Sequence, residues 1–79
     1  MSNKTYKQQL IDLLTNEVEI VSKQPFSYNR VYTKLRLIVY IKKINALPAN
    51  AITPRKFRHP VINSIYLFKP ELINKLYSK

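Results

Sequence analysis

Apolar side chains between residues 5 and 21 recur at intervals of three and four, and most of the charged and amide side chains fall outside this pattern. The spaced positions, one of them a glutamate, are Tyr6, Leu10, Leu13, Leu14, Glu17, Val18 and Val21. The spacing predicts an amphipathic helix from Thr5 to Val21. Ser2 or Asn3 can cap its start. Pro25 limits its end, so we expect a break at Ser22 to Phe26.

Residues 27 to 47 fit two periodicities. Ser27 can cap a helix that carries an apolar row made up of Tyr28, Val31, Leu35, Ile38 and Ile41. The same stretch also alternates as a strand would, with Leu35, Leu37, Val39 and Ile41 between Arg36, Ile38, Tyr40 and Lys42. Helix is favoured because the run exceeds the roughly ten residues of an ordinary strand. A helix from Tyr28 that gives way to a strand at Arg36 stays open.

The last part of the chain is divided by prolines. Pro48, Pro54 and Pro60 predict an irregular connector from residue 46 to residue 61, because each removes an amide donor and restricts the preceding residue. A short apolar stretch follows at residues 62 to 68. Pro70 and Glu71 suit the first turn of a final helix that runs through Leu72, Ile73, Leu76 and Tyr77.

These elements predict a mostly α-helical fold, a small single domain covering residues 1–79, with about three helices and a proline-rich basic loop. The 79 residues are too few for two cores, and an apolar content of 46% is enough for one. The alternative is an α+β, winged-helix-like domain in which residues 36–41 and 62–68 are strands. The chain has no Cys, so neither disulfides nor zinc–thiolate sites can stabilise it.

Charge gives the strongest functional indication. Fourteen Lys and Arg residues face four acidic residues, for a net charge of +10. The excess is unevenly placed, because residues 1–22 carry two cations and three acids whereas residues 23–79 carry twelve cations and one acid. Such a surface repels itself unless a polyanion neutralises it, and DNA and RNA are the commonest polyanions.

Two groups of residues are candidate nucleic-acid contacts. In the first, Arg55, Lys56 and Arg58 surround Phe57 in an extended segment between Pro54 and Pro60. The cations can neutralise phosphates, and the ring of Phe57 can stack on an unpaired base. The alternative for this segment is a solvated loop that Phe57 anchors to the core.

The second group comprises Arg30, Lys34, Arg36, Lys42 and Lys43, interleaved with Tyr28, Tyr32 and Tyr40. In a helix, Arg30 and Lys34 lie one turn apart, while Arg36 and Lys43 lie on another side. Ordinary surface charge is an equally good interpretation of this group. We expect the tyrosines to pack in or beside the core instead of serving as stacking platforms.

Catalytic, cofactor and metal sites are not expected, so the protein is not predicted to be an enzyme. Asp12, Glu17 and Glu19 are expected to be solvent-facing ions. His59 has no neighbouring ligand pattern and should make a backbone or phosphate contact. The lack of Gly forbids glycine loops that cradle phosphate. No apolar run reaches the roughly 18 residues of a membrane span, so membrane association is not expected.

The sequence therefore predicts a small basic nucleic-acid-binding protein that contacts mainly the phosphate backbone. RNA in a ribonucleoprotein is slightly favoured over duplex DNA, since an extended basic loop suits irregular RNA. We expect it to be soluble and intracellular, in the cytoplasm or in an organelle or virion interior. The alternative is a phage- or virus-type protein–protein interaction factor that binds an acidic surface of a host protein. An amphipathic membrane-surface binder ranks last.

Overall fold

A computed structural model describes residues 5–53 and 59–77, and every regular element in that part of the chain is helical. The helices are α1 (Tyr6–Ser22), α2 (Tyr28–Ala46), the 3-10 turn η1 (Ala49–Ala51), α3 (Pro60–Phe68) and α4 (Pro70–Tyr77). The mostly helical prediction is therefore confirmed, with four α-helices in place of about three. The strands considered for residues 36–41 and 62–68 are wrong, because both segments lie inside helices.

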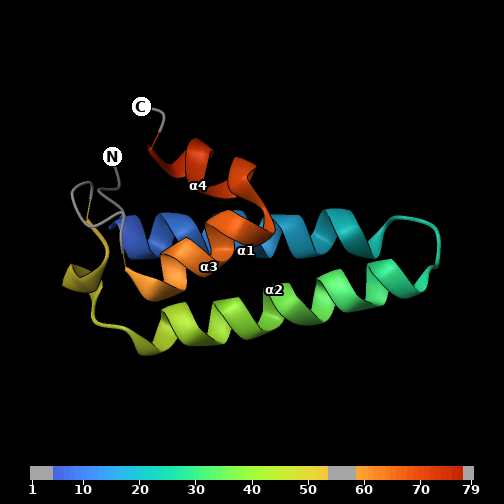
Figure 1. The fold of residues 1–79 in the computed structure, drawn as a ribbon, viewed down its shortest axis with the longest axis horizontal. Coiled ribbons are helices and arrows are strands. Elements are labelled where there is room, and N and C mark those ends of the chain that lie inside the picture. The colour runs from blue at the N-terminus through green and yellow to red at the C-terminus, as the bar shows by residue number, and fades with distance from the viewer. Residues whose placement is uncertain (1–4, 54–58, 78–79) are drawn as a thin grey trace.

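Helices α1 and α2 form a long antiparallel hairpin, and the two short C-terminal helices cover one side of it (Figure 1). α3 packs against α2, and α4 packs against α1 and α3. The break between α1 and α2 lies where Pro25 predicts it. The buried core draws on all four α-helices and on Ile52, which follows η1, and its members are Leu10, Leu14, Val21, Leu37, Tyr40, Ile44, Ile52, Ile62, Ile65, Leu72, Ile73 and Leu76.

Each of the first three α-helices begins at a side chain that accepts a backbone hydrogen bond. Thr5 Oγ1 accepts from the Gln8 amide at 3.1 Å, so Thr5 caps α1 and the predicted cap at Ser2 or Asn3 is wrong. Ser27 Oγ accepts from the Arg30 amide at 3.0 Å, as predicted. His59 Nδ1 accepts from the Val61 amide at 3.2 Å and starts α3, which is the backbone contact expected of this residue.

Lys69 joins the C-terminal helices to α1. Its Nζ lies 2.9 Å from Oε2 of Glu17 and 3.5 Å from Oε1 of Glu71. The hydrogen bond to Glu17 raises the pKa of Lys69. The Glu17 side chain is only 14% exposed, so the expectation of a solvent-facing ion is wrong for this residue. Its place on the apolar row of α1 turns it toward α4, where the ammonium of Lys69 neutralises it.

Tyr77 links α4 to the chain between α2 and α3. Its hydroxyl donates a hydrogen bond to the backbone oxygen of Thr53 at 3.0 Å, and its ring lies 5.5 Å from that of Tyr6. Burial raises the pKa of the Tyr77 hydroxyl. The N-terminus of α1, Thr53 and α4 are thus held together at one end of the hairpin.

Candidate nucleic-acid interface

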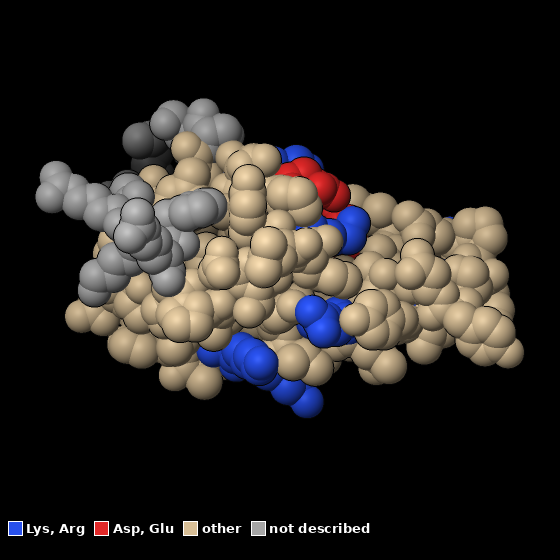
Figure 2. All heavy atoms as spheres, viewed as in Figure 1, with Lys and Arg blue, Asp and Glu red and all other residues tan. Residues whose placement is uncertain are grey.

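Helix α2 is a cationic helix. Its 19 residues include Arg30, Lys34, Arg36, Lys42 and Lys43 and no carboxylate. We refer to these five residues as the α2 cations. Figure 2 shows Lys and Arg side chains on part of the edge of the molecule that α2 forms, while the acidic side chains in this view lie nearer α4. Two of the four acidic residues, Glu17 and Glu71, are already paired with Lys69.

Three of the α2 cations are exposed lysines without an internal partner in the described residues. Lys34, Lys42 and Lys43 are all solvent-exposed, and within residues 5–53 and 59–77 none of them takes part in a hydrogen bond or ion pair. Their ammonium groups are therefore open to solvent and available to a binding partner. With no acid on the same helix, their fields add.

Arg30 differs from the lysines because it also closes the connection between α1 and α2. Its Nη1 donates to the backbone oxygens of Ser22 and Gln24, at 3.2 and 3.1 Å. Its guanidinium carbon lies 5.4 Å from the centre of the Phe26 ring. Arg30 thus satisfies carbonyl groups at the end of α1 that have no helical partner. It contributes charge to the surface but is held in place by the fold.

Arg36 is surrounded by aromatic rings. Its Nη2 donates to the Tyr40 hydroxyl at 2.6 Å, and its guanidinium carbon lies 5.7, 5.3 and 5.1 Å from the ring centres of Tyr32, Tyr40 and Phe68. Its Nε is buried and has no hydrogen-bond partner in the described residues. The rings hold the cation by cation–π attraction and keep it partly shielded from water. Arg36 is therefore a less accessible phosphate contact than the lysines.

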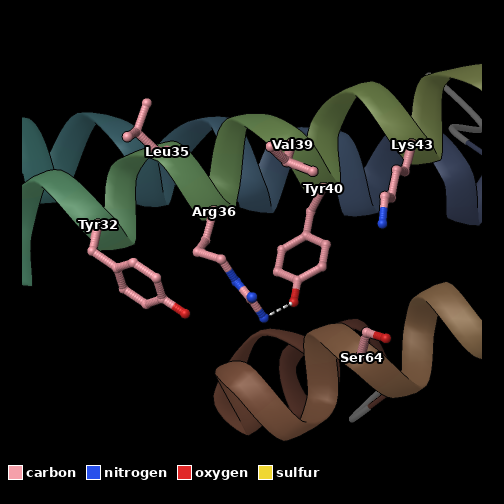
Figure 3. A pocket seen from close by; sticks show the side chains of 7 residues that line it. All are labelled: Tyr32, Leu35, Arg36, Val39, Tyr40, Lys43 and Ser64. Carbon is pink, nitrogen blue, oxygen red and sulfur yellow. Dashed lines mark hydrogen bonds between the residues drawn. The ribbon is translucent and has the colours of Figure 1, made fainter.

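A groove runs between α2 and α3 beside this cluster, with a volume of about 560 Å³. Its lining residues are Tyr32, Leu35, Arg36, Val39, Tyr40, Lys43 and Ser64. Figure 3 shows Tyr32, Arg36, Tyr40 and Lys43 reaching from α2 toward α3, with Leu35 turned away from α3 at the outer rim. The groove thus has an apolar outer rim and carries cationic groups along its length.

The apolar row predicted for α2 is wrong for Tyr28, Val31 and Leu35, while Ile41 of that row is partly buried and packs against the core. The residues of α2 that enter the core are Leu37, Tyr40 and Ile44, whereas Tyr28, Val31 and Leu35 are exposed. Tyr32 is exposed as well, so only Tyr40 of the three tyrosines packs in the core as expected. The error arises because α2 carries apolar residues on opposite sides, and periodicity cannot say which side meets α1.

The aromatic environment of Arg36 was not predicted. Tyr32, Arg36 and Tyr40 are spaced by four. In a helix this spacing places both tyrosine rings one turn from the guanidinium, so the contacts of Arg36 with the two tyrosines could have been predicted from the sequence. Phe68 comes from α3, and no local pattern connects it with Arg36.

Arg55, Lys56, Phe57 and Arg58, the first candidate group, lie outside the described residues. The residues before and after the undescribed segment 54–58, Thr53 and His59, are described and are held by the fold. Thr53 accepts the hydrogen bond from Tyr77, and His59 caps α3. The two residues that flank the segment are therefore held in place, Thr53 by α4 and His59 at the start of α3.

The described residues include no group of three or more His, Cys, Asp and Glu side chains that could hold a metal ion. Among the same residues, no helix is both long and apolar enough to cross a membrane. Comparison of the chain with models of protein families, with curated proteins and with solved structures gives no match.

Proposed function

We propose that this protein binds nucleic acid, mainly through the phosphate backbone, and that the α2 cations and residues Arg55, Lys56 and Arg58 supply the contacts. The observation that carries the proposal is the composition of α2, which has five cations and no carboxylate. Three of them are exposed lysines with no partner in the described residues. A surface of this kind attracts a polyanion and releases its condensed counterions on binding.

The spacing of the lysines suits a backbone. Lys34 and Lys42 are eight positions apart, so their Cα atoms are separated by about 12 Å along the helix axis. That distance covers several phosphates of one strand. Contacts of this type fix orientation and carry little sequence information, so binding should depend weakly on sequence.

RNA in a ribonucleoprotein is favoured slightly over duplex DNA. The support is the composition of residues 54–58, in which Phe57 can stack on an unpaired base while its neighbours contact phosphates. A protein with this function needs no cofactor and acts wherever nucleic acid is found, inside a cell, an organelle or a virion.

The test is fluorescence anisotropy with labelled single-stranded RNA, a stem-loop RNA and duplex DNA at low ionic strength. The double variant Lys42→Gln, Lys43→Gln removes two charges from α2. Its control, Lys7→Gln, Lys23→Gln, removes two charges at the two ends of α1. We expect the α2 variant to bind at least about tenfold more weakly than the wild type and the α1 variant to be clearly less affected. Equal effects would mean that net charge alone acts and that α2 is not the contact surface.

A further inference from the structure

The outward side of α2 carries a row of apolar side chains that the fold leaves uncovered. Tyr28, Tyr32, Leu35 and Val39 follow one another at intervals of four, three and four residues, and we call them the outer stripe. Their exposed fractions are 87, 54, 59 and 46%. This spacing is that of a seam between two packed helices. Since the opposite side of α2 already forms the core, the helix is apolar on two sides.

The groove between α2 and α3 extends this apolar surface on one side. On α3, Leu67 is 75% exposed and lies one helical turn beyond Ser64, which lines the groove. A binding partner would thus meet Leu35 and Val39 at the outer rim of the groove and α3 on its other side. Large apolar side chains gathered in this way mark an interaction site more often than chance exposure.

The charges beside the outer stripe specify the chemistry of the partner. Arg36 and Lys43 both line the groove, and their separation of seven residues places them on one side of α2, two turns apart. Lys42, seven positions after Leu35, lies at the other edge of the stripe by the same helical geometry, with Lys34 about 80° further round the helix. The stripe is thus flanked by cations on both sides, and α2 offers no carboxylate to pair with them.

From this arrangement we propose that the outer stripe and the α2–α3 groove bind an amphipathic helix of another protein. Its apolar residues, spaced by three and four, pack on Leu35, Val39 and Leu67. Its acidic residues, seven positions apart, face Arg36 and Lys43. This is the helix-in-groove mode of recognition. Charge complementarity determines which helices bind and in which orientation. The activity is additional to nucleic-acid binding and does not depend on it.

Two other occupants fit the surface less well. A second copy of the chain would bring together two molecules of net charge +10 and would set cations against cations along the seam. A nucleic-acid strand could stack on Tyr28 and Tyr32, but Leu35, Val39 and Leu67 offer it neither a charge nor an aromatic face. An acidic amphipathic helix satisfies both the apolar and the cationic parts.

The experiment uses the full chain and a labelled synthetic peptide of three heptads, with Leu at the seam positions and Glu at the flanking positions. A second peptide carries Lys in place of Glu. We expect saturable binding of the Glu peptide in anisotropy titrations and none of the Lys peptide. The double variant Leu35→Gln, Val39→Gln keeps the net charge and should bind the Glu peptide at least about tenfold more weakly. Leu67→Gln, on the other helix, should weaken it independently.

The same variants separate this proposal from the others. L35Q/V39Q should bind RNA and DNA as the wild type does, and its circular dichroism should be unchanged, since both side chains are exposed. Equal affinity of the wild type and L35Q/V39Q for the Glu peptide would overturn the proposal. Loss of oligonucleotide binding in L35Q/V39Q would also overturn it. A third contradicting result would be a wild-type protein that is dimeric in sedimentation equilibrium while L35Q/V39Q is monomeric.

Discussion

Glu17 and Lys69 are 52 positions apart in the chain, yet Oε2 of one lies 2.9 Å from Nζ of the other. The pair ties the middle of α1 to the junction between α3 and α4. Both side chains are largely withdrawn from solvent, so the interaction is screened less than a fully exposed ion pair. It fixes the C-terminal helices against the hairpin, and α3 in turn forms one wall of the groove.

Removal of this ion pair should destabilise the fold measurably. We expect Glu17→Gln to lower the free energy of unfolding by about 1 kcal/mol, since the ammonium of Lys69 loses its closest acceptor. Glu19→Gln is the matched control, because Glu19 lies on the same helix and is exposed. Urea unfolding followed by circular dichroism measures both. If both changes leave the free energy of unfolding almost unchanged, the Glu17–Lys69 ion pair does not hold α3 and α4 against α1.

The same pair makes stability depend on alkaline pH. The pKa of Lys69 is raised in the folded protein, mainly by its hydrogen bond to Glu17, so its contribution is complete below the unfolded pKa of about 10.4. The contribution is lost as pH rises through the higher folded value. Burial raises the pKa of Tyr77 as well, which gives the same sign. The midpoint of urea unfolding should therefore fall above about pH 10, and Lys69→Gln should make that fall smaller.

The orientation of α2 can be checked with two leucines that are two positions apart. Leu37 is fully buried and Leu35 is exposed. Leu37→Ala should cost about 2 to 4 kcal/mol because it leaves a cavity, whereas Leu35→Ala should change stability by less than about 0.5 kcal/mol. In a strand both side chains would share one face and the two costs would be similar. Similar costs in urea unfolding would therefore contradict a helix in this orientation.

The start of α2 depends on the Ser27 cap. Ser27→Ala removes the acceptor of the Arg30 amide and should lower the free energy of unfolding by about 1 kcal/mol. Ser27→Asp should preserve most of the wild-type stability, because its carboxylate can accept the same bond and favours a helix N-terminus. An Asp variant as unstable as the Ala variant would show that the cap is not what positions this end of α2.

The sequence is sufficient to predict α1, α4 and the start of α2, because Pro25, Ser27 and Pro70 mark these positions, but it leaves residues 36–41 of α2 open between helix and strand. It leaves Ile62 to Phe68 undecided, since a short apolar run suits a buried strand or a buried helix equally. Tertiary packing decides between them, with Ile62 and Ile65, three apart, both in the core. The buried side of α2 was predicted wrongly because the helix carries apolar residues on two sides. Which side faces solvent depends on α1 and α3, not on α2 alone.

The candidate site was predictable in its charges but not in its shape. The α2 cations follow from composition alone. The aromatic cluster around Arg36 includes Phe68 of α3, and the groove is lined by Ser64 of α3. Both features therefore depend on how α3 packs against α2, which the sequence does not show. The outer stripe is visible in the sequence as apolar spacing, but that spacing alone predicts a buried side.

If the positive surface binds the phosphates of a nucleic acid, as proposed, the affinity must depend strongly on salt concentration. For the wild type, the logarithm of the observed association constant with RNA should fall linearly with the logarithm of salt concentration. Replacing Arg55, Lys56 and Arg58 with Ala should reduce that slope by about two to three, because each cation that neutralises a phosphate adds nearly one to it. An unchanged slope would exclude those three residues as contacts. No association of the wild type with RNA or DNA at low ionic strength would contradict nucleic-acid binding as the function of this surface.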